Sequence, residues 1–166
     1  MHCLILGITD TGKTTLAFKL AACYKRRGTP VIVLDPDMRK DWNADFITDD
    51  PDKFLEVCKI NQSAALFIDE SGQTIGRYAG SMAWVATNSR KWGHKAHFIS
   101  QRATQLDILM RTQCSNLFLF KQGVNDSKIL AAEFVCPELM SACNLKKGEY
   151  LAKLGVDNEI KRGRAW

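Results

Sequence analysis

Short apolar segments alternate along the chain with longer segments in which apolar residues recur at helical spacing. Strands are expected at residues 3–7, 31–35, 64–69, 96–100 and 117–120, with a last strand near 149–154. Helices are expected near residues 13–27, 51–60, 77–92, 104–111 and 125–134. Gly28 and Gly93 stand where helices end, and Pro51 stands where a helix can begin. This alternation predicts an α/β domain with a mainly parallel sheet.

The first expected strand runs directly into a phosphate-binding pattern. Residues 7–14 read GITDTGKT, which fits G-x-x-x-x-G-K-[ST] between a strand and a helix. Gly7 and Gly12 let the backbone approach a phosphate, because neither carries a side chain that would clash. Lys13 brings a positive charge to the β- and γ-phosphates, and Thr14 offers a hydroxyl ligand to Mg²⁺. The chain is therefore expected to bind a nucleoside triphosphate, ATP with Mg²⁺. The residues expected to bind the nucleotide are Thr9, Asp10, Thr11, Gly12, Lys13, Thr14 and Thr15.

Two further strand ends carry polar residues. The third expected strand ends in Asp69 and Glu70, at the edge where parallel sheets bind ligands. We expect Asp69 to hold Mg²⁺ and Glu70 to polarise a water molecule for attack on the γ-phosphate. The fourth expected strand ends in Gln101. If this strand lies between the other two, Gln101 points at the γ-phosphate and can sense its presence.

The composition is that of an ordinary globular protein. The chain has 166 residues, 46% of them hydrophobic and 25% charged, and one domain over residues 1–166 is expected. Its apolar runs are shorter than the roughly 18 residues of a membrane span. Because no run is long enough to span a membrane, we expect a soluble protein. The phosphate loop begins too early to leave room for a signal peptide. The six cysteines form no C-x-x-C pair, and His94 and His97 lack neighbouring ligands, so a zinc site is not expected.

The net charge of +5 is unevenly distributed. Residues 146–166 contain six basic and three acidic residues. The basic residues are Lys146, Lys147, Lys153, Lys161, Arg162 and Arg164. Such a segment fits either a nucleic-acid surface or a solvated basic tail, and charge alone favours the tail.

Taken together, GITDTGKT, FIDE at 67–70 and ISQR at 99–102 resemble the FtsK/HerA superfamily of P-loop motors. Residues 90–120 resemble its segment of Arg-x-x-Gly, strand, Gln-Arg, helix and strand, and Asp-Ser-Lys at 126–128 resembles its Asp-Ser-basic helix start. The small size is similar to the genome-packaging ATPases of membrane-containing, tailless double-stranded DNA viruses. The resemblance implies a single RecA-like P-loop NTPase domain with strand order 5-1-4-3-2 and helices on both faces of the sheet.

The resemblance also implies partners. Proteins of this kind form rings, typically hexamers, around double-stranded DNA, with ATP between subunits and an arginine from the neighbour completing the site. Arg90 and Arg111 are the candidates here, although Asn116 stands where the FtsK-type pattern has an arginine. A viral packaging motor of this kind would work in the host cytoplasm or the virion, with a capsid vertex or membrane protein as a further partner. Arg77 and Tyr78 are candidates for contacting DNA.

Two other functions remain open from the sequence. The length also suits a small P-loop nucleoside or nucleotide kinase, and DESGQ at 69–73 is loosely similar to a thymidine kinase motif. The chain lacks the paired zinc-binding cysteines and the arginine-rich lid of such kinases. An inovirus-type assembly ATPase shares the core but normally carries a transmembrane segment.

Overall fold

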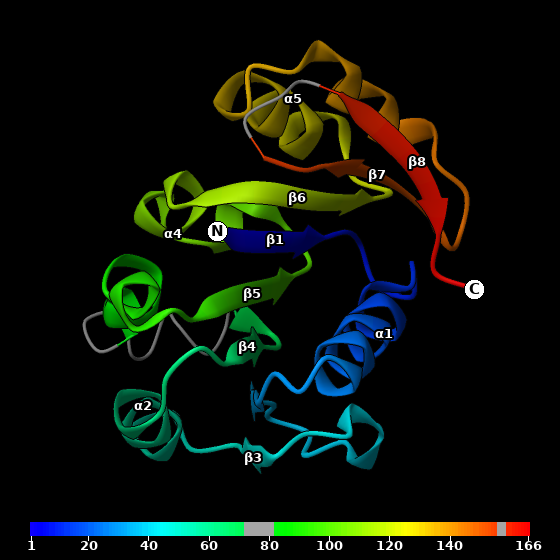
Figure 1. Ribbon diagram of the computed structural model, residues 1–166. Coiled ribbons are helices and arrows are strands. Elements are labelled where there is room, and N and C mark those ends of the chain that lie inside the picture. The colour runs from blue at the N-terminus through cyan, green and yellow to red at the C-terminus, as the bar shows by residue number, and fades with distance from the viewer. Residues whose placement is uncertain (72–81, 156–158) are drawn as a thin grey trace.

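In the computed structural model, which describes residues 1–71, 82–155 and 159–166, the chain forms one eight-stranded sheet (Figure 1). The strands are β1 His2–Leu6, β2 Val31–Leu34, β3 Phe46–Thr48, β4 Ala65–Ile68, β5 Lys95–Ser100, β6 Cys114–Phe120, β7 Glu149–Lys153 and β8 Ile160–Arg164. Their order in the sheet is β3-β2-β4-β5-β1-β6-β7-β8. Strands β1 to β6 pair in parallel, whereas β7 and β8 are added antiparallel at the β6 edge.

The expected order 5-1-4-3-2 is confirmed, because it corresponds to β6-β1-β5-β4-β2 in this sheet. The last expected strand, near 149–154, is β7. Two edge strands were not expected. β3 has only three residues, and β8 reads IKRGR, which lacks the apolar alternation by which strands are recognised. Charged residues on an outermost strand discourage unwanted pairing with another chain.

The helices also follow the expected pattern, with differences in two of them and with two 3-10 segments, Lys40–Trp42 and Pro137–Asn144, that were not expected. The α-helices are α1 Lys13–Arg26, α2 Pro51–Ile60, α4 Ile108–Thr112 and α5 Val124–Glu133. The 3-10 segments are η1 Lys40–Trp42, η2 Ser89–Trp92, η3 Ala103–Gln105 and η4 Pro137–Asn144. The helix expected at 104–111 is divided into η3 and α4, because Asp107 caps α4 by accepting a hydrogen bond from the Leu109 N–H (2.7 Å). Of the helix expected at 77–92, residues 82–87 are helical, and 77–81 lie outside the described residues.

The predicted helix boundaries have clear causes. Asp50 caps α2 by accepting from the Asp52 and Lys53 N–H groups, and Pro51 occupies the first helical turn, where its missing N–H costs nothing. Gly28 follows α1 with φ of 71°, a left-handed conformation that favours glycine at the end of a helix.

The core consists of two layers, one on each face of the sheet. On β1, Leu4 and Leu6 belong to the layer under α2, α4, α5 and η4, whereas Cys3 and Ile5 belong to the layer under α1. Because helices cover both faces, every residue of β1, β2 and β4 is buried. Figure 1 shows the loop between β1 and α1 at one end of the sheet, with the C-terminal residue of the chain at the same end. In the described part of the chain, no helix is long and apolar enough to cross a membrane.

The side chains of His94 and His97 form hydrogen bonds within this core. The Ala64 N–H donates to His94 Nδ1 (3.1 Å), so His94 Nε2 carries the hydrogen and donates to the Cys58 carbonyl (3.0 Å). His97 Nδ1 donates to the Leu66 carbonyl (3.1 Å), and Tyr24 bonds to its Nε2 (3.3 Å). Within the described residues, no three His, Cys, Asp or Glu side chains form a group that could hold a metal.

Burial of His97 predicts that the protein loses stability in mild acid. Burial lowers the pKa of His97 from 6.5 to about 4, because the charged ring would lose its water. Between these two pH values the unfolded chain binds a proton that the folded chain excludes. Stability is therefore full above pH 6.5 and falls toward pH 4, by on the order of 3 kcal/mol for this group.

The measurement is the melting temperature of wild type and His97→Asn across this pH range. Asparagine keeps an N–H donor for the Leu66 carbonyl but does not titrate. We expect a shallower decline in the variant, although His2, whose pKa burial also lowers to about 4, leaves some decline in place. An equal decline in both proteins would show that His97 is not responsible.

Candidate nucleotide-binding site

The loop between β1 and α1 presents the start of a helix to an anion. Gly12 is the N-cap residue of α1 and has φ of 108°, a left-handed conformation that glycine adopts without strain. Among the described residues no side chain caps this end, and the first turn of α1 contains no acidic residue. The free N–H groups and the positive end of the helix dipole therefore favour a phosphate group here.

Close packing fixes the shape of the loop. A Cβ on Gly7 would lie 2.5 Å from Phe120 Cβ and 2.8 Å from Thr11 Oγ1, so β6 and the loop itself exclude any side chain there. Thr11 is buried, and its hydroxyl donates to the Ile8 carbonyl (2.7 Å). The Thr11 side chain thus folds the loop, which leaves its backbone to contact a phosphate. Asp10 has φ of 59°, a strained conformation of the kind that occurs at functional loops.

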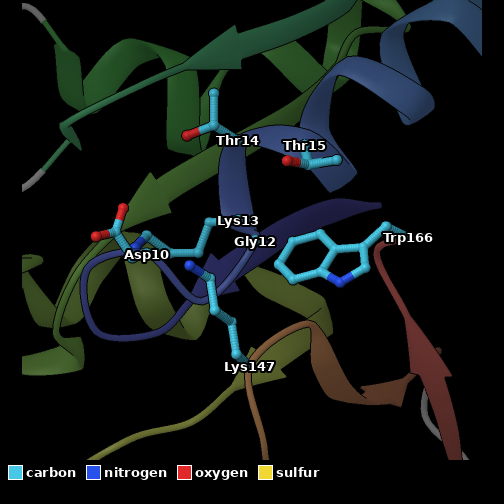
Figure 2. Close-up of a pocket in the computed structure, with 7 residues that line it drawn as sticks. All are labelled: Asp10, Gly12, Lys13, Thr14, Thr15, Lys147 and Trp166. Atoms are coloured by element: carbon cyan, nitrogen blue, oxygen red, sulfur yellow. The ribbon is translucent and has the colours of Figure 1, made fainter.

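A cavity of about 300 Å³ opens over this loop (Figure 2). It is lined by Asp10, Gly12, Lys13, Thr14, Thr15, Lys147 and Trp166. The first five are among the residues expected to bind the nucleotide. Thr9 is exposed outside the lining, and Lys147 and Trp166 were not expected.

Lys13 arches back over the loop, where its ammonium group donates to the Ile8 carbonyl (3.0 Å). Burial lowers the pKa of Lys13, whereas the negative charges of Asp69, Glu70 and Asp10 act to raise it. Because Asp69 and Glu70 affect this pKa, both residues lie within electrostatic reach of the phosphate loop. A bound phosphate would add negative charge and so stabilise the protonated lysine further.

Asp69 directly follows β4, and its side chain is 5% exposed. Each of its carboxylate oxygens accepts a hydrogen bond. Its Oδ1 accepts from the Glu70 N–H (2.9 Å), and its Oδ2 accepts from Arg39 Nη1. Arg39 also bonds to Asp37 and lies 3.8 Å from Asp35. Burial disfavours the charged guanidinium, but the hydrogen bonds to Asp37 and Asp69 outweigh it and raise the pKa of Arg39. Arg39 therefore orients the acidic residue on which the metal assignment rests.

Thr14 and Asp69 have the chemistry that Mg²⁺ requires. Hydroxyl and carboxylate oxygens are the ligands that this hard cation prefers. Each carboxylate oxygen has two lone pairs, so accepting from Arg39 and from the Glu70 N–H does not by itself use the whole acceptor capacity of Asp69. The residues present therefore fit the metal, which would neutralise charge on the phosphates when bound.

Glu70 is held in an unusual conformation. Its φ of 48° is left-handed, which costs a non-glycine residue on the order of 1–3 kcal/mol. The hydrogen bond to Asp69 fixes its N–H, and the next residue, Ser71, donates its hydroxyl to the Ile99 carbonyl of β5 (2.7 Å). Strain of this kind persists where the surrounding structure over-determines it, as at active sites.

Gln101 follows β5, which lies between β1 and β4 as the assignment of Gln101 required. The Gly7 N–H donates to the Ser100 carbonyl (3.4 Å), so the end of β5 meets the start of the phosphate loop. Gln122, beyond β6, donates to the Gln101 carbonyl (2.9 Å) and anchors its backbone. Gln101 is thus fixed beside the loop, at the same edge of the sheet as Asp69.

The next residue, Arg102, joins two of the motifs. Its Nε donates to Asp126 Oδ2 (3.1 Å), and Asp126 is almost fully buried in the first turn of α5. The Thr104 hydroxyl donates to the other oxygen of Asp126 (3.4 Å). The Gln-Arg element and the Asp-Ser-Lys element are therefore bonded to each other.

The two candidate arginines lie away from the phosphate loop. Arg90 lies in η2, just before β5. The pKa of the Met1 amino group is lowered mainly by burial and next by the positive charge of Arg90, so Arg90 lies near the start of β1. Arg90 is therefore at the amino edge of the sheet, about 20 Å from the loop by the length of β5. It is exposed and donates to the Gln113 carbonyl (3.2 Å).

Arg111 differs from Arg90 in its surroundings. Its side chain is only 12% exposed and bonds to both carboxylate oxygens of Glu133. It also donates to the Ala103 and Leu106 carbonyls. Arg111 thus joins η3, α4 and α5 within one subunit. Asn116, at the position of the FtsK-type arginine, accepts from the Gly155 N–H (2.8 Å) and ties β6 to the end of β7.

Three site residues were not predicted from the sequence. Arg39 lies in the segment after β2, outside the motifs that the sequence offers. Lys147 stands out in the sequence only as part of the basic segment 146–166, and Trp166 lies 154 positions from Gly12 with no motif to connect them. The antiparallel return of β7 and β8 brings both to the loop.

Several solved structures share this fold. The genome packaging NTPase B204 from Sulfolobus turreted icosahedral virus 2, in complex with AMPPCP, matches with a TM-score of 0.78 and 16% sequence identity, over 98% of this chain and 96% of that chain. The pCW3 conjugation coupling protein TcpA matches with a TM-score of 0.70 and 18% identity, over 98% of this chain and 59% of that chain. VirB4 of Thermoanaerobacter pseudethanolicus matches with a TM-score of 0.71 and 12% identity, over 98% and 88% of the two chains.

At such identities the structures establish the fold, that of a P-loop NTPase. No curated protein sequence matches the chain. A sequence model of one protein family does match, over residues 1–114, a range that includes the phosphate loop, Asp69, Glu70 and Gln101. That model is described as adenylylsulphate kinase, and on this match the chain belongs to the adenylylsulphate kinase family.

Proposed function

We propose that this protein hydrolyses ATP with Mg²⁺ and uses the energy to move double-stranded DNA, as one subunit of a ring. The observation that carries the proposal is the position of β5 between β1 and β4. This position brings Lys13, Glu70 and Gln101 from three neighbouring strands to one edge of the sheet. The viral packaging NTPase, which matches over nearly its whole length, supports the DNA-moving role.

Glu70 supplies the step that separates a hydrolase from a kinase. A hydrolase must activate water, whereas a kinase passes the phosphoryl group to a bound hydroxyl. A glutamate beside the phosphates can accept the proton of the attacking water as the water oxygen bonds to the γ-phosphorus. The bond from that phosphorus to the bridging oxygen of the β-phosphate then breaks, and ADP leaves. Lys13 would stabilise the charge on the phosphate oxygens, and the Gln101 amide would contact the γ-phosphate.

A ring explains how the site is completed. The cavity is open, and Arg90 of the same subunit lies at the opposite edge of the sheet, too far from the loop to contact the phosphates. In a ring, the amino edge of one subunit can face the phosphate loop of the next. Arg90 is exposed and therefore suited to this role, whereas Arg111 is bonded within its own subunit.

The DNA surface that we favour includes the outer strand β8. Lys161, Arg162 and Arg164 are exposed on it, while Lys153 is buried and donates to the Gly155 carbonyl (3.1 Å). Contacts of this kind are made to phosphates and tolerate any sequence, which a motor that moves along DNA requires. DNA affinity should therefore fall steeply as the salt concentration rises.

A second candidate function is phosphoryl transfer to a small acceptor. The family match favours it, since adenylylsulphate kinases by name act on adenylyl sulphate. The same phosphate loop would serve either reaction. The two functions differ in what receives the phosphoryl group, water or an acceptor hydroxyl, and one assay can separate them.

The deciding experiment measures release of inorganic phosphate from ATP, alone, with double-stranded DNA and with adenylyl sulphate. We expect DNA to stimulate release several-fold and adenylyl sulphate to yield no phosphorylated acceptor. Stoichiometric transfer to adenylyl sulphate, without stimulation by DNA, would establish the kinase and overturn the motor.

Mixing experiments test the ring. We expect Arg90→Ala subunits, titrated into wild type at fixed total protein, to reduce activity more than dilution does, because each removes a group from its neighbour's site. Arg111→Ala serves as the comparison and should lower the melting temperature, since it breaks the bonds to Glu133. If both titrations fall in proportion to the wild-type fraction, each subunit hydrolyses ATP alone.

A further inference from the structure

Trp166 lies directly against the backbone of the phosphate loop. A Cβ on Gly12 would be 2.6 Å from Trp166 Cζ3, and a Cβ on Gly148 would be 2.7 Å from its Cε2 and Cζ2. The indole therefore rests on two glycines, at distances that any side chain would prevent. Gly148 has φ of 85°, which independently favours glycine at this position.

Hydrogen bonds fix the backbone on which the indole sits. The Gly148 N–H donates to the Thr11 carbonyl of the phosphate loop (3.0 Å). The Ala165 N–H, immediately before Trp166, donates to the Gly148 carbonyl (2.9 Å). Ala165 is fully buried in the core layer under α1. The loop, the start of β7 and the residue after β8 thus form one connected unit that holds the tryptophan in place.

The rest of the indole is open. Trp166 is 58% exposed and lines the same cavity as Lys13 and Thr15. Figure 2 shows the ring beside Gly12 and Thr15, with Lys147 nearby and Asp10 on the opposite side of the loop. Leaving so large an apolar surface in water is unfavourable, and an aromatic face of this kind is well suited to stack on another flat ring.

The two ends of the cavity therefore differ in chemistry. Lys13 and the start of α1 attract phosphates, and the ring of Trp166 offers a flat, apolar surface beside them. A nucleoside triphosphate has the same division between its charged tail and its flat base. Stacking recognises the face of a base rather than its hydrogen-bonding edge, so every base can bind but a larger ring binds better.

We propose that the open face of Trp166 stacks on the base of the bound nucleoside triphosphate, and that the site accepts purine nucleotides with little preference between adenine and guanine. The inference rests on the proposed function, because it takes a nucleoside triphosphate as the ligand of this cavity. It adds the residue that binds the base and the range of substrates that this residue allows.

Calorimetric titration of Trp166→Ala with AMPPCP and with inorganic tripolyphosphate tests the proposal. Removal of a stacked aromatic ring should weaken AMPPCP binding roughly tenfold. Tripolyphosphate has no base, so its affinity should stay within about twofold of wild type. Trp166→Phe keeps a smaller ring and should recover most of the affinity. For the wild-type protein, GMPPCP should bind about as tightly as AMPPCP, and CMPPCP more weakly.

A matched control is Trp92→Ala, which removes another partly exposed tryptophan at the amino edge of the sheet and should change neither affinity. Equal weakening of AMPPCP and tripolyphosphate by Trp166→Ala would overturn the proposal, since the ring would then only support the loop. Unchanged AMPPCP affinity would overturn it as well. Failure of wild type to bind either ligand would instead refute the proposed function itself, and this inference with it.

Discussion

Lys13→Ala should lower ATP turnover by roughly 10²–10³-fold or more while leaving the protein folded. This lysine donates to the Ile8 carbonyl, a bond that holds its ammonium group over the phosphate loop. Loss of one such charge from a site that stabilises developing negative charge has effects of this size. Nucleotide affinity should fall as well, because the ground-state phosphates also lose this contact.

The same substitution should not lower the melting temperature. Burial lowers the pKa of Lys13, so the folded state disfavours its charge and gains nothing in stability from it. Lys19→Ala removes an exposed lysine from the same helix and should leave turnover unchanged. Near-normal hydrolysis by a folded Lys13→Ala protein would show that the phosphates bind elsewhere.

The parts of this site that the sequence predicts are those built from neighbouring residues. The phosphate loop joins a strand to a helix, so its glycines, Lys13 and Thr14 can be recognised from spacing alone. Asp69 and Glu70 are recognisable for a similar reason, because they directly follow a buried strand. The strand order was less accessible. The resemblance to a superfamily implies it, whereas the apolar pattern does not indicate which strands are neighbours.

The residues that escaped prediction depend on long-range packing. Trp166 reaches the phosphate loop only because β7 and β8 return antiparallel beyond β6. β8 itself has no apolar alternation, so the sequence predicts neither this strand nor the position of Trp166 at the phosphate loop. Arg39 reaches Asp69 because β2 and β4 are adjacent and end at the same edge of the sheet.

Arg90 and Arg111 illustrate a different limit. Both are arginines in short helical segments that precede strands, so the sequence alone does not indicate which of them could act in a neighbouring subunit. The structure separates them by their partners, since Arg111 is bonded to Glu133 and two carbonyls whereas Arg90 is exposed. An arginine that acts in a neighbouring subunit must give up few bonds within its own subunit. Those bonds are visible only in the three-dimensional structure.

Glu70→Gln should produce a protein that binds ATP with near-normal affinity and hydrolyses it about 10²–10⁴-fold more slowly. An amide keeps the size and polarity of the side chain but cannot accept the proton of the attacking water. The backbone strain is unchanged, because φ of 48° is equally unfavourable for glutamine and for glutamate. The fold and the hydrogen bond from the Glu70 N–H to Asp69 should therefore survive.

Two measurements on the same preparation distinguish a base from a structural residue. Calorimetry with AMPPCP should give wild-type affinity, and phosphate release should be nearly absent. Glu70→Gly offers the complementary test, because glycine removes the carboxylate and also relieves the left-handed strain at this position. It should be as inactive as Glu70→Gln. If Glu70→Gln instead loses nucleotide affinity, Glu70 acts through the metal or the shape of the site, and the water that attacks the γ-phosphate must be activated by another group.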